Sequence, residues 1–474
     1  MKKILLGISI ASSLFLFQSC NEDDYLTREP SETISTPNVE QKVNGMFATM
    51  IVTGSGGTTA HEDFGQKGVD IFTDMLQSDL ALSRNVYNRY ASFASYGSTS
   101  DFTSTNNYIP WRYYYKIIYS ANDIMNDLGG DTPKLETDID KVYYGQALAM
   151  RGYAYFYLLQ LFTKEYDPAA KGVPMVTSIK QENAPMKTQK EIYDLIISDL
   201  TKAEGYLEGA VRSNKIKVDQ DVARGLLAYT YAAMNENQKA AEYSKKLMDS
   251  GYPLTTKEEL TGGFNTVENK SWIWGADITT EMSIDLISWW GQMDWYTYSY
   301  QAFGDYKCID DNLRNSISND DVRKNQFKQM VAGYWMGSDK FYDKGRVRLG
   351  ARIIQADYIF MRVDEFYMLY AEAMAKSGNE AAAKSTLKTL LASRITDLSF
   401  IDSLSGSALL DEIYHQTRIE FWAEGKSYLA MKRNKKDVVR GANHNALANQ
   451  TIKFTDDRLT FRIPQAEVIN NPDL

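Results

Sequence analysis

A helix over residues 138–162 constrains the fold of this chain more than any other stretch. One stripe of apolar and small side chains recurs there at steps of three and four residues: Val142, Gly145, Ala149, Gly152, Phe156 and Leu159. Thr137 or Asp138 can cap the start of the helix, because a short side-chain oxygen accepts a hydrogen bond from an N–H group of the first turn. The small residues allow a second helix to approach closely. We therefore expect an aromatic-rich core helix against which other helices pack.

The segment after this helix cannot continue it. Gly172, Val173 and Pro174 follow an acidic turn about ten residues after Phe162, and proline lacks the N–H group that a helix interior needs. The residue before a proline also favours extended backbone. The sequence therefore predicts a helix that ends near residue 162 and an extended segment near residue 174.

Two helix–turn–helix pairs extend the helical pattern. Residues 219–250 turn at Asn235-Glu236-Asn237, and residues 365–394 turn at Ser377-Gly378-Asn379. Such pairs look like tetratricopeptide repeats, although their spacing is irregular. Further helices are expected over residues 38–53, 111–128, 189–207 and, as two helices joined near Gly425, 409–433. The predicted fold class is mostly α, a tetratricopeptide-like helical repeat scaffold with an irregular, loop-rich lobe.

Two stretches lack helical periodicity and are assigned to that irregular lobe. Residues 82–107 are rich in Ser, Thr, Asn, Tyr and Arg, which predicts a long surface loop. Residues 263–312 concentrate tryptophan and tyrosine among Gly, Ser and Asp. Within them, Trp272 and Trp274 alternate around Ile273, which is the pattern of a half-buried strand.

Charge and motifs argue against several classes of function. The formal net charge is −9, and no dense run of Lys and Arg offers a surface for nucleic acid. The sequence contains no nucleophile-elbow, Walker A or zinc-protease motif, so we predict a protein that is not an enzyme and needs no cofactor. Its three histidines are too far apart to form a metal motif. Glu420 and Glu424 lie on one helix face, which is more typical of a solvated or arginine-paired face than of a catalytic carboxylate pair.

Residues 1–19 have the pattern of a lipoprotein signal peptide. Two lysines precede a short apolar run that ends before Cys20, and this run is too short to span a bilayer. The residues before Cys20 resemble a lipobox, with Phe17 in place of the usual leucine. We expect Cys20 to be acylated and to anchor the protein in a membrane. Cys308 then remains as a single thiol, so no internal disulfide is expected.

Several motifs, in order along the chain, resemble the SusD/RagB family of surface lipoproteins from Bacteroidetes. The motifs are an acidic start followed by Tyr25-Leu26 and Pro30, the pattern W-x3-Y-x2-I-x2-A-N from Trp111 to Asn122, RGYAYFYLLQLF with GVPMV after it, RIEFWAEG from Arg418 to Gly425, and a closing segment from Phe461 to Pro472. The resemblance implies a lipid anchor at the outer face of the outer membrane and a SusC-like TonB-dependent transporter as partner. The implied function is capture of oligosaccharide and its delivery to that transporter.

The resemblance also implies the domain organisation. Residues 20–474 would form one domain, in which the repeat helices occupy about 38–53, 108–250 and 358–433. The irregular ligand lobe would be built from about 54–107 and 251–357.

A candidate glycan site follows from the aromatic residues of this lobe. Sugar rings present apolar C–H faces on which aromatic rings stack, and polar neighbours bind the hydroxyl groups. In SusD-like proteins the ligand site is assembled from loops in these two parts of the chain. The predicted ligand-binding residues are Trp289, Trp290, Asp294, Trp295, Tyr296 and Tyr298 from the second part and Arg84, Tyr87 and Tyr90 from the first.

Three alternatives stay open at this point. The RagB branch of the family suggests a peptide ligand, which an extended cleft would favour. A surface hydrolase would need two carboxylates about 5–10 Å apart across an aromatic cleft. A structural cap on the transporter, with no ligand of its own, would be favoured by burial of Trp289, Trp290 and Trp295.

Overall fold

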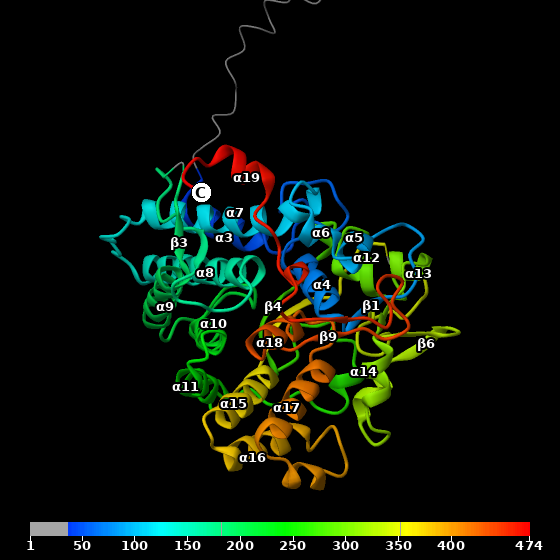
Figure 1. Cartoon of the computed structure of the whole chain (residues 1–474). Helices are drawn as coiled ribbons and strands as arrows, with labels where there is room; N and C mark the ends of the chain where they lie inside the picture. Colours follow the sequence, from blue (N-terminus) through cyan, green and yellow to red (C-terminus); the bar gives the residue numbers. More distant parts are fainter. Residues whose placement is uncertain (1–36, 182, 351) are drawn as a thin grey trace, which may run out of the picture. The chain divides into compact units, whose positions relative to one another are not determined.

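The computed structural model describes residues 37–181, 183–350 and 352–474. The predicted signal peptide, the acylation site Cys20 and the acidic start of the mature chain lie outside the described residues. Residues 39–474 fold as a unit of their own. In that unit, long helices form the scaffold, and short helices and strand pairs make up the rest (Figure 1).

Helix α8 (Asp138–Phe162) has the bounds that its sequence pattern predicts. The Thr137 hydroxyl accepts the N–H of Asp140 at 3.2 Å, and the Asp140 carboxylate accepts the N–H of Thr137 at 3.0 Å. This reciprocal pair is a capping box, which satisfies two N–H groups that the first turn leaves without partners. After α8 the chain enters strand β2 (Lys171–Pro174), so the predicted extended segment is also confirmed.

Helix α8 lies against two neighbours, α7 (Thr105–Asp127) and α9 (Gln189–Tyr206). A Cβ atom added at Gly145 would lie 3.0 Å from Tyr206, and one added at Gly152 would lie 3.0 Å from Leu200. Both distances are shorter than an ordinary carbon–carbon contact. The close approach that the small residues of α8 predict is therefore confirmed.

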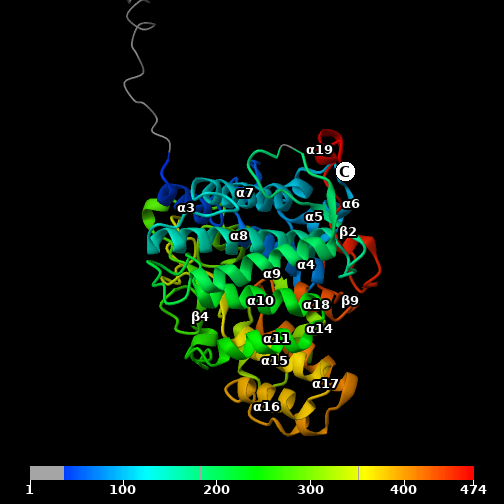
Figure 2. The ribbon, with the colours of Figure 1, turned by 90° about the vertical axis from the view of Figure 1, so that its left-hand side faces the viewer.

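The scaffold is a succession of helices in which each one contacts the next (Figure 2). After α9 the series continues with α10 (Gln220–Ala233), α11 (Asn237–Met248), α15 (Asp364–Lys376), α16 (Glu380–Leu391) and α17 (Gly406–Glu420). Helix α11 packs directly on α15, although residues 249–363 separate them in sequence. This arrangement confirms the predicted fold class.

Two further helices, α3 and α18, complete the scaffold. Helix α3 (Val39–Ala48) packs on α7 and α8, and it ends earlier than the predicted 38–53 because the chain turns after Ala48. Helix α18 (Ser427–Arg433) follows α17 after a turn at Gly425, as predicted, and packs on α4 (Gln66–Gln77).

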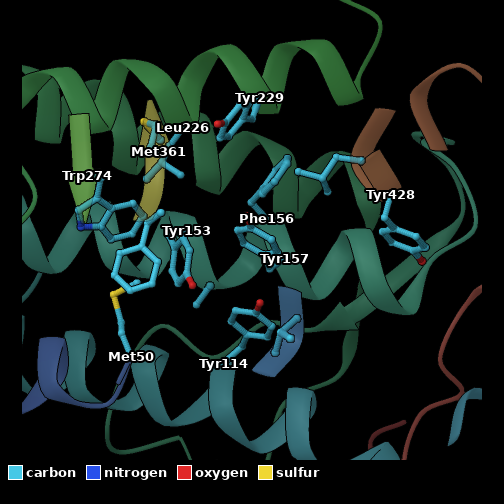
Figure 3. Packing of buried hydrophobic residues seen from close by; sticks show 14 of the residues in the cluster. Met50, Tyr114, Tyr153, Phe156, Tyr157, Leu226, Tyr229, Trp274, Met361 and Tyr428 are labelled. Atoms are coloured by element: carbon cyan, nitrogen blue, oxygen red, sulfur yellow. The ribbon is translucent and has the colours of Figure 1, made fainter. Parts of the chain in front are cut away.

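Aromatic side chains fill the space between α7, α8 and α10 (Figure 3). Tyr157 stacks on Tyr114 of α7, with ring centroids 5.5 Å apart and ring planes 8° from parallel. Phe156 lies against Tyr229 of α10, with centroids 6.2 Å apart. Burial raises the pKa of Tyr157 to about 12, so its hydroxyl stays neutral. Aromatic pairs of this kind add about 0.5–1.5 kcal/mol each beyond the area that they bury.

Strands in the described part of the chain form two-stranded antiparallel pairs. The pairs are β1 (Leu80–Leu82) with β5 (Lys307–Ile309), β2 with β3 (Met186–Thr188), β4 (Trp272–Ala276) with β8 (Tyr358–Arg362), β6 (Lys328–Val331) with β7 (Tyr334–Met336), and β9 (Val438–Val439) with β10 (Thr451–Ile452). Short helices lie between the strands, namely α5 (Ala91–Ala94), α6 (Gly97–Ser100), α12 (Trp289–Met293), α13 (Tyr300–Phe303) and α14 (Asp311–Ser316), and α19 (Gln465–Asn470) follows the last strand. The pairing of β1 with β5 joins two segments that are distant in sequence.

The strand at Trp272 and Trp274 is present, but it is not half-buried as predicted. The two side chains are 0% and 2% exposed. Trp274 lies edge-on against Tyr153 of α8 and donates its indole N–H to the carbonyl of Ile216 at 2.8 Å. The strand packs against the scaffold and all five of its residues are buried. The alternation around Ile273 therefore does not correspond to one buried and one solvent-facing side.

Residues 82–107 are not the long surface loop that their composition predicts. They contain α5 and α6, and Tyr90, Phe93 and Tyr96 are at most 1% exposed. Phe93 stacks on Phe72 of α4, with centroids 3.8 Å apart. These three aromatic residues, spaced three apart, draw the segment into the core.

A buried ionic network ties the irregular segments to the end of α17. Its carboxylates are Asp321, Asp364, Glu420 and Glu424, and its cations are Arg323, Lys340, Arg362 and Arg394, each at most 3% exposed. Glu420 accepts hydrogen bonds from Arg362 and Arg394, both at 2.9 Å. Burial alone would raise the pKa of Glu420, but the surrounding arginines outweigh it and hold the pKa well below its usual range. Of the two predicted settings for this carboxylate pair, the arginine-paired one is confirmed.

Replacing Gly225 of α10 by valine should destabilise the scaffold. A Cβ atom at this position would lie 2.5 Å from Met361 Sδ and 2.7 Å from Phe366 Cζ, and both side chains are buried. Overpacking a core typically costs about 1–3 kcal/mol, so Gly225→Val should lower the midpoint of thermal unfolding. Gly205→Ala is the control, because a Cβ atom there meets nothing within 4 Å and alanine favours helix. Equal losses in both variants would contradict the packing explanation.

The decrease in the free energy of unfolding at acid pH should depend on Glu372 of α15. Its carboxylate accepts hydrogen bonds from Arg433 at 2.8 Å and from Lys376 at 2.9 Å. Burial by itself raises the pKa of Glu372, but these two cations outweigh burial and hold the pKa at about 2. A carboxylate with a depressed pKa stabilises the fold above its unfolded pKa of about 4.3, and this contribution is lost as the pH falls toward the folded value.

Denaturant unfolding of Glu372→Gln should therefore show a flatter decline of the free energy of unfolding between about pH 5 and pH 2. The difference from the unmodified protein over this range should be roughly 3 kcal/mol. Glu136→Gln, at an exposed position, should retain the original slope. An unchanged slope in Glu372→Gln would show that this carboxylate does not control acid stability.

Candidate ligand-binding site

Two segments that are far apart in sequence meet in the irregular part of the structure. Strands β1 and β5 place Ala81 opposite Cys308, and the N–H of Ser83 donates to the carbonyl of Tyr306 at 2.8 Å. The residues that follow β1 therefore lie beside those that precede β5. Helices α5, α12 and α13 gather in this region (Figure 1).

One carboxylate, Asp305, holds the segment after β1 in place. It accepts the backbone N–H groups of Val86 at 2.6 Å, Tyr87 at 2.7 Å and Arg89 at 3.1 Å. Asn88 lies between them with φ 62°, in the left-handed region that asparagine tolerates better than most residues. Asp305 is 0% exposed, so these N–H groups satisfy a carboxylate that would otherwise be costly to bury.

The segment presents Tyr87 at the surface beside three other side chains, and we call His61, Tyr87, Arg89 and Tyr300 the Tyr87 cluster. Tyr87 is 49% exposed, and its ring lies edge-on to Tyr300 with centroids 5.6 Å apart. The Arg89 guanidinium lies 5.0 Å from the centre of the Tyr300 ring. The Tyr300 hydroxyl lies 2.6 Å from His61 Nδ1.

The protonation states of the Tyr87 cluster follow from its surroundings. Burial lowers the pKa of His61, and the charge of Arg89 acts in the same direction. Burial raises the pKa of Tyr300. At neutral pH the imidazole is therefore neutral and the phenol is protonated, so the hydrogen bond between the Tyr300 hydroxyl and His61 Nδ1 joins two uncharged groups. The cluster combines an exposed ring with N–H donors, a combination that fits a ligand with apolar faces and many hydroxyl groups.

Trp289 and Trp290 do not form the predicted exposed platform. Each is 1% exposed. They lie edge-on to one another, with centroids 5.0 Å apart, and Trp289 also packs against Phe341 at 4.5 Å. Because α12 turns both rings into the core, a ligand cannot reach their faces, and we leave them out of the candidate site.

The sequence predicts Asp294 as a ligand-binding residue, but its carboxylate is used inside the protein. It accepts the backbone N–H groups of Tyr296 at 3.0 Å, Thr297 at 3.1 Å and Asp343 at 3.1 Å. It is 0% exposed, and burial raises its pKa to about 7 despite these hydrogen bonds. Asp294 therefore shapes the turn after α12, and the prediction of direct ligand contact is not supported by this placement.

Trp295, Tyr296 and Tyr298 lie nearer the surface, but arginines cover their rings. The guanidinium of Arg348 lies 4.3 Å from the Trp295 ring centre, that of Arg346 lies 5.3 Å from Tyr296, and that of Arg352 lies 4.8 Å from Tyr298. All three arginines are exposed. A ligand on this surface would meet guanidinium groups before it met the predicted aromatic faces.

The three residues predicted from the first segment differ in their exposure to solvent. Arg84 and Tyr87 are exposed, as predicted, whereas Tyr90 is 1% exposed. Tyr90 begins α5 with φ 60° and packs on Phe72 with centroids 5.5 Å apart, so it belongs to the core.

The sequence analysis identifies Tyr87 and misses the other three members of the Tyr87 cluster. His61 belongs to no metal motif, and Arg89 carries no signal of its own. Tyr300 was one of many aromatic residues in its stretch. The one available clue was Asp305, an acidic residue directly after Gly304 in an otherwise aromatic segment.

A hollow of about 300 Å³ lies beside α7 and α19, apart from the Tyr87 cluster. Trp111 lines it but is only 4% exposed, because its ring packs against Tyr115 and Phe162 at 4.8 Å each. The Trp111 ring therefore offers little surface to a ligand in this hollow. Within the described residues, no three His, Cys, Asp or Glu side chains are grouped as a metal site would require, and no helix there has the length and apolarity to cross a bilayer.

Asp305→Ala should loosen the segment that carries Tyr87. Three backbone N–H groups lose their acceptor, and a lost hydrogen bond to a charged group costs about 1.5–3 kcal/mol. Hydrogen exchange followed by mass spectrometry should show faster exchange in peptides that contain residues 84–90, with little change in α8. Asp277→Ala, at an exposed position in the same irregular part, should leave this exchange unchanged. Equal protection in Asp305→Ala and the unmodified protein would show that the carboxylate does not hold the segment.

Comparison with known families gives matches to two family models. One, described as starch-binding and associating with the outer membrane, matches residues 24–232. The other, described as the SusD family, matches residues 288–474. A search of curated proteins found no match.

Solved structures share the fold over most of the chain. A SusD-like carbohydrate-binding protein from Bacteroides vulgatus is 24% identical, with a TM-score of 0.79 over 92% of this chain and 96% of its own. A SusD superfamily protein from Bacteroides fragilis is 23% identical, with a TM-score of 0.75 over 94% and 100% of the two chains. Surface glycan-binding protein A from Bacteroides thetaiotaomicron, solved with laminarihexaose, is 15% identical, with a TM-score of 0.69 over 91% and 97%.

Proposed function

The chain belongs to the SusD/RagB family, and from this premise we propose that it is a cell-surface lipoprotein that binds oligosaccharide and delivers it to a SusC-like TonB-dependent transporter. Family membership and the glycan complex of a relative support carbohydrate binding in nutrient uptake. The family description also supports association with the outer membrane. The anchor in this proposal is an acylated Cys20.

The observation that carries the binding function is the Tyr87 cluster. Tyr87 presents a ring that is about half exposed, and Asp305 fixes the backbone that carries it. A ring held in this way loses little conformational freedom when a sugar stacks on it. His61 and Arg89 stand beside it as N–H donors for hydroxyl groups. The site needs affinity alone, so we propose a binding protein rather than an enzyme.

The same proposal assigns separate roles to the repeat helices and to the irregular lobe. The repeat helices, about residues 38–53, 108–250 and 358–433, would form a rigid scaffold that docks on the transporter. The irregular lobe, about 54–107 and 251–357, would hold the ligand over the mouth of the transporter.

One observation favours a second candidate, a structural cap on the transporter without a ligand of its own. Trp289, Trp290 and Trp295 are at most 5% exposed, so the aromatic stretch contributes more to the core than to a binding surface. The surface aromatic group that remains is smaller than the predicted platform. A binding experiment separates the two candidates.

Tyr87→Ala should weaken glycan binding. Isothermal titration calorimetry of the purified protein against a panel of neutral and acidic polysaccharides should identify a ligand, and the variant should bind it about five- to thirtyfold more weakly, since an aromatic contact is worth about 1–2 kcal/mol. Tyr119→Ala is the control, because Tyr119 is 58% exposed on scaffold helix α7. Equal binding by Tyr87→Ala and the unmodified protein would move the site elsewhere, and no binding to any glycan would favour the cap.

A further inference from the structure

We propose that the ligand of this site is an acidic oligosaccharide, and that Arg84 and Arg348 bind its carboxylate or sulfate groups. This inference rests on the proposed function and adds the chemical class of the ligand. It follows from where the arginines of the irregular part lie and from which of them lack an acidic partner.

The two arginines cover neighbouring rings of one aromatic cluster. The guanidinium of Arg348 lies 4.3 Å from the centre of Trp295, and that of Arg84 lies 5.3 Å from the centre of Tyr306. The two rings lie 6.4 Å apart. Arg348 and Arg84 therefore lie over two rings of the same aromatic cluster.

Helix α13 and the residue after it connect this surface to the Tyr87 cluster. Arg348 donates to the carbonyl of Ala302 at 3.0 Å, and a Cβ atom at Gly304 would lie 3.9 Å from the Arg84 guanidinium carbon. Tyr300, in the first turn of the same helix, carries Arg89 over its ring at 5.0 Å. Three guanidinium groups thus surround one short helix beside the exposed ring of Tyr87.

Arg84 and Arg348 lack carboxylate partners within the described part of the chain. Their polar contacts there are to uncharged oxygens, the Tyr306 hydroxyl at 3.4 Å and the Ala302 carbonyl. Two nearby arginines differ in this respect, because Arg352 pairs with Asp285 at 3.1 Å and Arg346 pairs with Asp339. Positive charge without a partner is notable on a chain whose formal net charge is −9.

The acidic groups close to this surface are already engaged. Asp305 is buried and accepts three backbone N–H groups. Glu62 is 5% exposed and lies 3.9 Å from Arg89, at the outer limit of an ion pair. The Nε atom of Arg89 is buried without a hydrogen-bond partner among the described residues. The outward-facing charge of the site is therefore positive.

The guanidinium groups of Arg84 and Arg348 each use one terminal nitrogen in the contacts above, and their other N–H groups have no hydrogen-bond partner among the described residues. Those N–H groups match the two oxygens of a carboxylate or sulfate, and such charge-assisted pairs are about twice as strong as neutral hydrogen bonds. A neutral sugar would meet the same guanidinium groups and gain less from them. The arrangement therefore favours an acidic glycan over a neutral one.

Two matched pairs of polysaccharides test this inference by titration calorimetry. Polygalacturonate is compared with its fully methyl-esterified form, and dextran sulfate with dextran. At least one acidic member should bind about tenfold or more tightly than its neutral counterpart, since hydrogen bonds to charged groups contribute about 1.5–3 kcal/mol each. The pair that shows the difference identifies carboxylate or sulfate as the recognised group. Added salt should weaken the acidic ligand selectively.

Arg84→Gln and Arg348→Gln should each reduce binding of the acidic member about tenfold or more and leave binding of the neutral member unchanged. Arg352→Gln is the matched control, because Arg352 is also exposed and stacked but is paired with Asp285. Unchanged thermal unfolding would show that the variants are folded.

Three outcomes would overturn the inference. Equal affinity for acidic and neutral members, with binding lost in Tyr87→Ala, would reject the acidic ligand and retain the proposed glycan function. Loss of binding in Arg352→Gln equal to that in Arg84→Gln would reject the assignment of these two arginines. Binding of an acidic peptide in place of every glycan would overturn both the inference and the proposed function.

Discussion

The buried ionic network around Glu420 and Glu424 is the interaction on which the arrangement of this chain depends. Arg394 lies in the turn after α16, whereas Arg323, Lys340 and Arg362 come from the long segment inserted between α11 and α15. Buried ion pairs contribute little net stability compared with apolar packing, because removing charges from water is costly. Their geometry is specific, however, since each misplaced partner would leave a buried charge unpaired. We infer that the network selects one position of the inserted segment on the scaffold.

At the candidate site, as in the ionic network, a buried charge fixes the position of a distant segment that supplies its partners. Asp305 is a buried carboxylate whose hydrogen bonds go to the backbone of a segment more than two hundred residues away in sequence. The β1–β5 pairing brings the two segments together, and Asp305 then sets the conformation that carries Tyr87. The exposed ring is positioned by a carboxylate that is itself buried.

The sequence predicted those elements whose patterns are long. Helix α8, the turns at Asn235-Glu236-Asn237 and Ser377-Gly378-Asn379, and the family all follow from periodicity and ordered motifs. The ligand-binding residues were harder to predict than the helices, because composition shows that residues 289–306 are aromatic but not which way each ring points. Trp289 and Trp290 lie in a helix of five residues, too short for a periodic pattern to reveal its buried face. Likewise, the arginine partners of Glu420 come from three separate segments, and no local sequence pattern predicts that they contact it.

The contact between α11 and α15 has a consequence for how relatives of this protein can diverge. The insertion of residues 249–363 leaves and re-enters the scaffold at two helices that pack on each other, so its ends stay close whatever lies between. The entropy of closing a flexible loop grows only with the logarithm of its length, about 0.6 kcal/mol for each doubling. Stretches between the network anchors can therefore lengthen, shorten or change composition at small thermodynamic cost. Such an architecture permits new recognition surfaces to evolve on an unchanged helical frame.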